Sequence, residues 1–202
     1  MTVIVLGIDP GAVATGWALM RLDRGRSPVF LDAATTARSK PADYRPTQHL
    51  PVEADYLKKL AATGALVART AREAATANGR PVAPIVVGIE GITRPNWHMN
   101  GRAAANPEAL IAAAIVLGNI QAWATTQFGP YTEIPPGGNG SAPLGTYPTQ
   151  LVSDAERRKA NWHAAIGASG KLRHQRSAWD VALTAARTNL NTHTSNTKRS
   201  TT

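Results

Sequence analysis

Two apolar runs that each end in an acidic residue constrain the fold of this chain more than any other feature. Residues 3–8 are apolar or glycine and lead directly to Asp9, and the similar run at 84–89 leads to Glu90. Uninterrupted runs of this length predict strands that are buried on both faces. Open α/β sheets place metal and ligand sites at the carboxyl ends of such strands. We therefore expect Asp9 and Glu90 to lie together at one end of a sheet.

The remaining segments predict the elements that surround these two strands. They are strands at 15–20, 29–35 and 131–134, and helices at 53–77, 107–128 and from about residue 177 to 190. Three adjacent strands followed by alternation indicate an α/β fold. We expect a mixed five-stranded sheet, with three antiparallel strands and then parallel ones, and with helices on both faces.

A length of 202 residues fits one domain, which we expect to span residues 1–190. Residues 191–202 are rich in Thr, Asn and Ser and predict a disordered polar tail. Residues 135–148 are rich in Gly and Pro and predict an irregular segment, to which the sequence assigns no role. The pattern Ser-Asp-Ala-Glu at 153–156 is a capping box that predicts the start of a basic helix.

Charge and composition narrow the classes of partner and compartment. Lys and Arg number 22 against 13 Asp and Glu, a formal net charge of +9. This excess favours nucleic acid as a partner, although a basic tail and a solvated surface give the same total. The absence of cysteine excludes disulfides and thiolate metal sites. The longest apolar stretch, 109–117, is too short to span a membrane. We expect a cytoplasmic protein, bacterial or in the host of a virus, that binds no membrane.

A third acidic residue, Asp180, lies in what we expect to be the first turn of the Ala-rich last helix. Carboxylate oxygens are the ligands that Mg²⁺ prefers. Carboxylates converging from two strand ends and one helix would hold two such ions about 4 Å apart. The bound ions would also relieve the repulsion between the carboxylates. Each acid also has a plain alternative: a turn at Asp9, a partly exposed strand end at Glu90, and a capping box that joins Ser177 to Asp180.

These motifs resemble those of the RuvC-type Holliday junction resolvases, within the ribonuclease H-like superfamily. The run Gly-Ile-Asp-Pro-Gly at 7–11, followed by Thr-Gly-Trp at 15–17, is similar to the first-strand motif of that family. The sequence Ile-Glu-Gly at 89–91 resembles the family's second acid, and Asp-Val-Ala at 180–182 resembles its C-terminal acidic helix.

The resemblance implies a fold, a chemistry and a partner. Asp9, Glu90 and Asp180 would be ligands of two Mg²⁺ ions, for which Mn²⁺ would substitute. The protein would be a homodimer, joined through the helix 107–128, that nicks two strands of a four-way DNA junction symmetrically. The all-round apolar start of that helix also predicts burial on several sides.

The sequence departs from the family at the fourth ligand. The family carries Asp or His one helical turn before the last acid, and this chain has Ser177 there. His174 is a second candidate ligand, but on a continuous helix it lies about 240° around the axis from Asp180. We expect His174 to reach the site only from the preceding loop, or to be a solvated loop residue.

Two groups of residues are candidate DNA contacts, with solvated surface charge as the alternative for each member. The family places an aromatic residue shortly after the second acid, and the nearest one here is Trp97. The first group mixes cations with stacking surfaces and comprises Arg94, Trp97, His98 and Arg102. The second group could neutralise phosphates beside the last helix and comprises Arg157, Arg158, Lys171, Arg173 and Arg176.

We therefore expect a Mg²⁺-dependent, structure-selective DNA endonuclease that resolves four-way junctions. A catalytically weak junction-binding protein is one alternative, because Ser177 is a poor Mg²⁺ ligand. A related nuclease acting on other branched DNA or on RNA is another. An actin-like ATPase fragment also begins with Gly-Ile-Asp-x-Gly, but the sequence has no second glycine-rich phosphate motif after a later Asp strand.

Overall fold

The fold is built on one mixed five-stranded sheet. The computed structural model describes residues 2–39, 52–77, 82–92 and 107–199. The strands are β1 (Thr2–Asp9), β2 (Ala14–Asp23), β3 (Val29–Ala37), β4 (Ile85–Glu90) and β5 (Thr132–Ile134). Their order in the sheet is β3-β2-β1-β4-β5, with β1–β2 and β2–β3 antiparallel and β1–β4 and β4–β5 parallel. The predicted sheet is confirmed.

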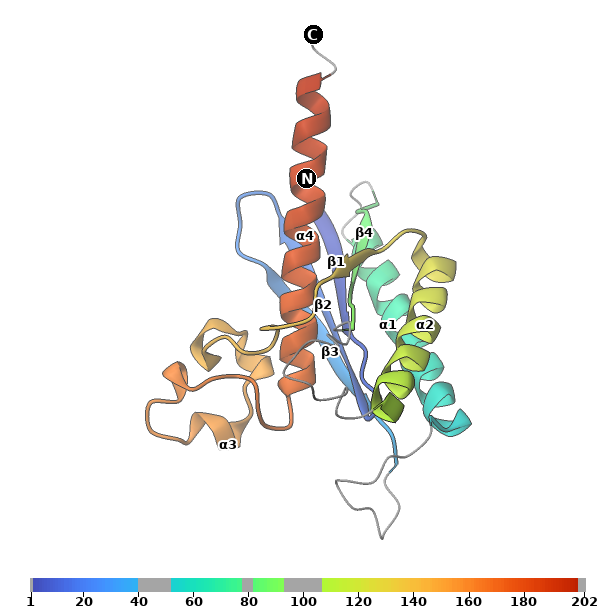
Figure 1. The fold of residues 1–202 in the computed structure, drawn as a ribbon. Helices are drawn as coiled ribbons and strands as arrows, with labels where there is room; N and C mark the ends of the chain where they lie inside the picture. Colours follow the sequence, from blue (N-terminus) through green and yellow to red (C-terminus); the bar gives the residue numbers. More distant parts are fainter. Residues whose placement is uncertain (1, 40–51, 78–81, 93–106, 200–202) are drawn as a thin grey trace, which may run out of the picture.

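Helices cover both faces of this sheet, as predicted (Figure 1). On one face, α1 (Ala54–Thr76) and α2 (Pro107–Phe128) bury the side of β1 that carries Ile4, Leu6 and Ile8. On the other face, α4 (Arg173–Arg199) lies across the strands. Because both faces are covered, the central strand β1 is buried from residue 3 to residue 8, which explains why its sequence is a continuous apolar run.

The last helix is longer at both ends than the sequence predicted. It begins at Arg173 rather than near Ser177 and continues to Arg199. Asp180 therefore lies in its third turn, and the predicted capping box between Ser177 and Asp180 at a helix start is wrong. The helix continues past residue 190 to Arg199 because the chain between 174 and 199 contains no Gly or Pro to end it, and the disorder expected for residues 191–202 stays a prediction.

Small residues let α4 lie directly on the strands. A Cβ at Gly7 of β1 would lie 2.6 Å from the amide nitrogen of Ala182, and a Cβ at Gly16 of β2 would overlap the carbonyl oxygen of His174. On the helix side, Ala178 and Ala182 are fully buried. The first turns of α4 are therefore pressed against the carboxyl end of β1, where Asp9 lies.

Between β5 and α4 the chain forms a lobe, residues 135–172, that contains the short helix α3 (Asp154–Arg157) and the 3-10 turns η2 (Leu144–Thr146), η3 (Thr149–Leu151) and η4 (Trp162–Ala164). The predicted capping box of Ser153 and Glu156 is present. A buried ion pair attaches the lobe to α4: Nη2 of Arg176 lies 3.1 Å from Oε1 of Glu156.

Arg176 is 0 % exposed and also donates to the carbonyl oxygens of Gly167 (2.9 Å), Leu151 (2.8 Å) and Ser169. A buried guanidinium is tolerated here because it is paired and fully hydrogen-bonded. The prediction that Arg176 contacts DNA is therefore wrong.

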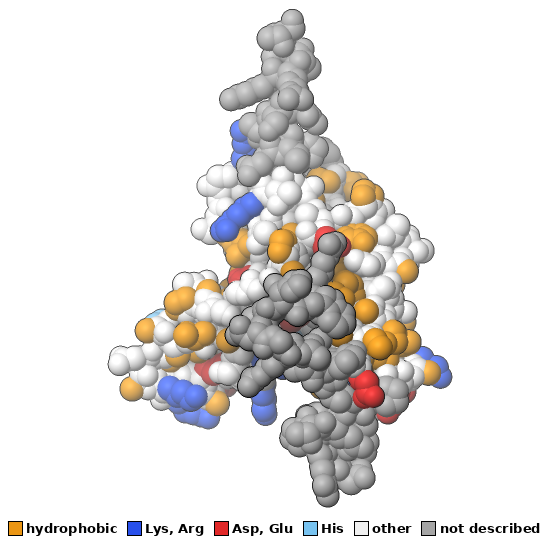
Figure 2. Space-filling model, in the orientation of Figure 1, with side chains coloured by type: hydrophobic (Ala, Val, Ile, Leu, Met, Phe, Trp, Pro, Cys, Tyr) orange, Lys and Arg blue, Asp and Glu red, His pale blue; other side chains and the backbone are white. Residues whose placement is uncertain are grey.

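The apolar start of α2 is only partly covered within one chain. Val116 and Ile120 are buried against the sheet, whereas Ile111 is 60 % exposed and Ile115 48 %. The prediction of burial on several sides therefore fails for the single chain, and hydrophobic side chains lie on the surface along this part of the molecule (Figure 2). By length and composition, α2 is the one helix in the described ranges that could cross a membrane, a test that the core helix of a soluble protein also passes.

Candidate active site

Asp9 and Glu90 lie at the carboxyl ends of neighbouring parallel strands. The register pairs Ile8 with Ile89, so the two acids follow at the same level. Their carboxyl groups therefore interact electrostatically. Burial raises the pKa of Glu90, and the negative charge of Asp9 raises it further, while hydrogen bonds from Asn139 and Ser177 oppose the shift. Two carboxylates are thus held together at an electrostatic cost that a bound cation would relieve.

His174 reaches this pair from the first turn of α4. Its Nδ1 lies 3.0 Å from Oδ2 of Asp9. Because a carboxylate only accepts hydrogen bonds, this contact assigns the proton to Nδ1. The expectation that His174 could reach the site only from the preceding loop is wrong. The angle of about 240° from Asp180 is also about 120° in the other direction, and the close approach of α4 to Gly16 brings the imidazole over the end of β1.

Ser177, one turn further along α4, contacts the other acid. Its Oγ donates to Oε2 of Glu90 at 3.0 Å. Ser177 therefore acts on a carboxylate of the neighbouring strand rather than as a helix cap. His174 and Ser177 hold one acid each.

The third acid, Asp180 of α4, is held by a different set of donors. Its Oδ2 accepts hydrogen bonds from the amide of Gly140 (2.8 Å) and from the hydroxyl of Tyr147 (2.7 Å). Burial raises the pKa of Asp180, and these two donors oppose that shift. Burial and the adjacent carboxylate of Asp180 also raise the pKa of Tyr147 well above its usual range, so the hydroxyl keeps its proton and donates it.

Buried hydrogen bonds from α1 fix the turn that follows Asp9. The hydroxyl of Tyr56 donates to the carbonyl oxygen of Gly11 at 2.9 Å and lies 3.0 Å from Oγ1 of Thr15. Thr15 in turn accepts from the amide of Gly11 at 3.4 Å. Tyr56 is fully buried, and this burial raises the pKa of its hydroxyl. The Gly-x-x-x-Thr part of the first-strand motif therefore serves to orient Asp9.

The sequence did not identify Asn139, Gly140 or Tyr147 as site residues. All three belong to the Gly- and Pro-rich segment 135–148. The side-chain amide of Asn139 donates to Oε1 of Glu90 at 2.9 Å. The run Gly-Gly-Asn-Gly at 137–140 is a signal for a loop that approaches another backbone closely, whereas nothing local distinguishes Tyr147.

A cleft of about 130 Å³ opens beside Asp9, His174 and Ser177. It is lined by Asp9, Asn139, Gly140, Ala168, Arg173, His174 and Ser177. Within the described ranges, no three His, Cys, Asp or Glu side chains converge closely enough to hold one metal ion. The three predicted acids therefore do not form a single three-ligand group: Asp9 and Glu90 lie at neighbouring strand ends, and Asp180 is held separately by Gly140 and Tyr147. As a close pair of carboxylates, Asp9 and Glu90 fit a hard divalent cation.

The structure describes only the second of the two groups of predicted DNA contacts. The first group, Arg94, Trp97, His98 and Arg102, lies outside the described residues. In the second group, Arg157, Arg158, Lys171 and Arg173 are exposed, and Arg157 is paired with Asp154. Figure 2 shows Lys and Arg side chains gathered on the lobe that carries α3.

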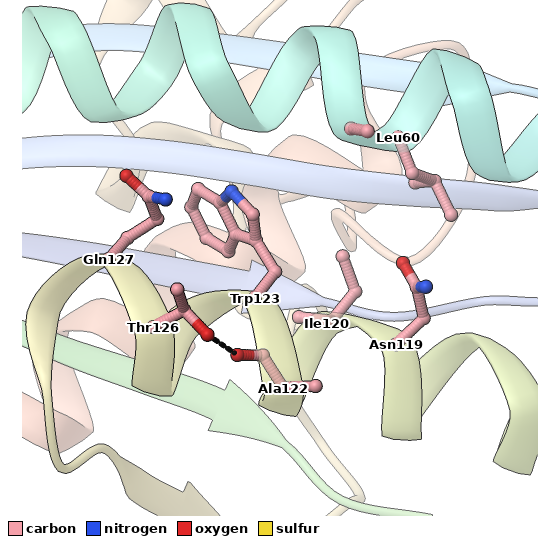
Figure 3. Close-up of a pocket in the computed structure, with 8 residues that line it drawn as sticks. Leu60, Asn119, Ile120, Ala122, Trp123, Thr126 and Gln127 are labelled. Atoms are coloured by element: carbon pink, nitrogen blue, oxygen red, sulfur yellow. Dashed lines mark hydrogen bonds between the residues drawn. The ribbon is translucent and has the colours of Figure 1, made fainter.

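A second cavity, of about 340 Å³, lies between α1 and α2 (Figure 3). It is lined by Leu60, Ala61, Asn119, Ile120, Ala122, Trp123, Thr126 and Gln127. None of these side chains titrates in the ordinary pH range, so this cavity offers no group for acid–base or metal chemistry.

The chain has a RuvC-type, ribonuclease H-like fold. A structure of Thermus thermophilus RuvC matches 91% of this chain and 92% of that chain, with a TM-score of 0.51 and 17% identity. T. thermophilus RuvC in complex with a Holliday junction substrate matches over the same shares, with a TM-score of 0.49 and 17% identity. An Aquifex aeolicus PPX-GPPA enzyme matches 69% of this chain and 38% of that chain, with a TM-score of 0.39 and 11% identity. No protein-family model and no curated protein matches the sequence.

Proposed function

We propose that this protein is a metal-dependent, structure-selective DNA endonuclease that resolves four-way junctions by paired, symmetric nicks. One observation carries the proposal. Asp9 and Glu90 meet at the ends of two parallel strands of a RuvC-type fold, and His174 and Ser177 of α4 each hold one of them. The first-strand motif at residues 7–17 supports the same reading.

Asp9 and Glu90 would hold Mg²⁺ or Mn²⁺, and Asp180 would complete the site for a second ion. When bound, such ions supply the activated water and the charge stabilisation that phosphodiester hydrolysis needs. The protein's own residues orient the ligands. His174 fixes Oδ2 of Asp9, and Ser177 fixes Oε2 of Glu90. Tyr56 holds the turn after β1, so that Asp9 keeps its direction.

The charge of the chain favours DNA as the substrate. The net charge is +9, and Arg173 lines the cleft beside the acids. Arg157, Arg158 and Lys171 are exposed on the lobe next to α4. Cations in these positions would neutralise the phosphates of a duplex arm that enters the cleft.

Paired nicks require two active sites, which a homodimer supplies. The exposed apolar side of α2 offers a surface for the second copy: Ile111 and Ile115 are exposed, and a Cβ at Gly118 would meet nothing within 4 Å in the single chain. Contiguous exposed apolar surface of this kind marks interaction sites, and one patch used twice gives a symmetric dimer.

The second candidate function is a junction-binding protein with weak catalysis. It is favoured by Ser177 at the family's fourth ligand position, because a hydroxyl is a poor ligand for Mg²⁺. A related nuclease that acts on other branched DNA or on RNA would use the same residues.

One cleavage assay separates these functions. A labelled four-way junction, a three-way junction, a linear duplex and an RNA duplex of matched sequence are incubated with the protein in Mg²⁺ or in EDTA. We expect symmetric nicks in the four-way junction when Mg²⁺ is present and no cleavage in EDTA. Binding to the junction without cleavage in Mg²⁺ or Mn²⁺ would favour the second candidate. Equal cleavage of the linear duplex would contradict structure selectivity.

A further inference from the structure

One short segment donates four hydrogen bonds to two of the predicted site acids, Glu90 and Asp180. The segment is residues 137–147, which we name the carboxylate clasp. Gly137 and Asn139 donate to Glu90, and Gly140 and Tyr147 donate to Asp180. The two acids come from different elements, β4 and α4, so the clasp bridges these two elements.

The donors of the clasp act on one oxygen of each acid. On Glu90, Asn139 donates at 2.9 Å and Gly137 at 3.4 Å, both to Oε1, while Ser177 donates to Oε2. On Asp180, both donors end on Oδ2. The carboxylate of Asp180 is therefore held through one oxygen, and Oδ1 is the oxygen that remains for a cation.

Tyr147 has a fixed direction of donation. Its hydroxyl accepts from the amide of Ala142 at 3.1 Å and donates to Asp180 at 2.7 Å. Its ring is buried and belongs to the core cluster that includes Leu144, Leu151 and Val152. Packing alone would be satisfied by phenylalanine, so the hydroxyl is the part of this residue that acts on the acid.

The backbone of the clasp can approach Asp180 only because residue 140 is glycine. Gly140 has φ +75°, and a Cβ there would lie 3.0 Å from the amide nitrogen of Ser177. Both the left-handed backbone and the contact with α4 exclude a side chain. The clasp is thus seated on the same helix that carries His174, Ser177 and Asp180.

We propose that the carboxylate clasp positions Glu90 and Asp180 for cation binding, with Tyr147 as the positioning residue of Asp180. This inference rests on the proposed metal-dependent function and names residues that support its ligands. Groups that hydrogen-bond to metal ligands fix ligand orientation, and their loss costs about 10–100-fold in metal affinity or activity. Asn139 has the corresponding role for Glu90.

The test is Tyr147→Phe, with metal binding measured on the full chain without DNA. Mn²⁺ is titrated and the free ion is followed by electron paramagnetic resonance, beside thermal unfolding. We expect Mn²⁺ affinity to fall by about 10–100-fold, and the metal concentration that gives half-maximal junction cleavage to rise by the same factor. The matched control is Tyr131→Phe, whose ring packs on the other core cluster, and its Mn²⁺ affinity should be unchanged.

Asn139→Ala is the second variant if Tyr147→Phe does not fold, and it should weaken Mn²⁺ binding through Glu90. Unchanged Mn²⁺ affinity in the folded variants, with junction cleavage by the unaltered protein intact, would overturn the clasp and leave the proposed function standing. Absence of both Mn²⁺ binding and cleavage in the unaltered protein would overturn both.

Discussion

Alanine in place of Gly16 tests how closely α4 must approach the sheet for the site to form. A Cβ on this residue would overlap the carbonyl oxygen of His174 and lie 3.0 Å from its Cβ. Atoms in contact normally lie about 3.5–4.0 Å apart, so the first turn of α4 must withdraw by roughly 1–2 Å. That turn carries His174 to Asp9.

The expected effect on activity exceeds the effect on stability. Overpacking of this kind destabilises the folded state by about 1–3 kcal/mol. Alanine also lowers the conformational entropy of the unfolded chain, which offsets about 0.4–1 kcal/mol of that loss. The folded state should therefore survive. A displacement of about 1 Å of the groups that hold a reaction centre costs about 100-fold in rate. We expect a loss of that size in the single-turnover rate of junction cleavage.

The assay compares Gly16→Ala with Gly64→Ala. A Cβ at Gly64 would lie 2.9 Å from the ring of Trp123, so this control overpacks the interface of α1 and α2 on the other face of the sheet. Thermal unfolding and cleavage are measured for both. An unchanged cleavage rate in Gly16→Ala, or equal losses in the two variants, would refute the link between the α4 contact and the site.

Three further outcomes are expected. Glu90→Gln should raise the melting temperature of the metal-free protein at neutral pH, because burial and then the charge of Asp9 raise the pKa of Glu90 above its ordinary 4.5. The folded form holds that proton more tightly than the unfolded form, so stability falls as pH rises from 4.5 through the raised pKa. The melting temperature, measured in EDTA across this pH range, should fall in the unaltered protein and should lose that part of its pH dependence in the variant. Arg176→Met should cost about 3–5 kcal/mol in chemical denaturation, because it leaves Glu156 without its buried partner, whereas exposed Arg173→Met should change stability by less than about 0.5 kcal/mol. Gly118→Glu should give a folded monomer in sedimentation, and a monomeric unaltered protein at micromolar concentration would contradict the dimer.

The strands and two of the acids could be predicted from the sequence because their signals are local. An apolar run buried on both faces reads as a strand without knowledge of its neighbours, and this was sufficient to place Asp9 and Glu90 at strand ends. The long α2 was predicted for a similar reason, since its start at Asn106-Pro107-Glu108 is a local capping signal.

The start of α4 could not be predicted because its stabilising contacts are distant in the chain. Residues 171–176, Lys-Leu-Arg-His-Gln-Arg, read as a solvated basic loop. In the fold, Arg176 is buried because Glu156, 20 residues away, neutralises it. His174 contacts Asp9 across 165 residues of sequence. The sequence therefore predicted Arg176 to contact DNA, and it left His174 either a ligand reaching in from a loop or a solvated loop residue.

The clasp was missed for the same physical reason. Its hydrogen bonds to Glu90 and Asp180 span 49 and 40 residues, and a Gly- and Pro-rich stretch gives no periodicity from which to infer them. The far end of α4 was not predicted either. Polar composition favoured disorder there, whereas a helix that is already formed and meets no Gly or Pro continues at little cost.

Asp9→Asn is the most direct test of the central claim, that the pair of Asp9 and Glu90 is a metal-dependent cleavage centre. The substitution keeps the shape of the side chain and removes one negative charge that faces phosphate. Cleavage of a four-way junction in Mg²⁺ and binding of the same junction in EDTA are measured side by side. We expect cleavage to be abolished while binding persists or tightens. A variant that still cleaves at the rate of the unaltered protein would contradict the assignment of this pair as the active site.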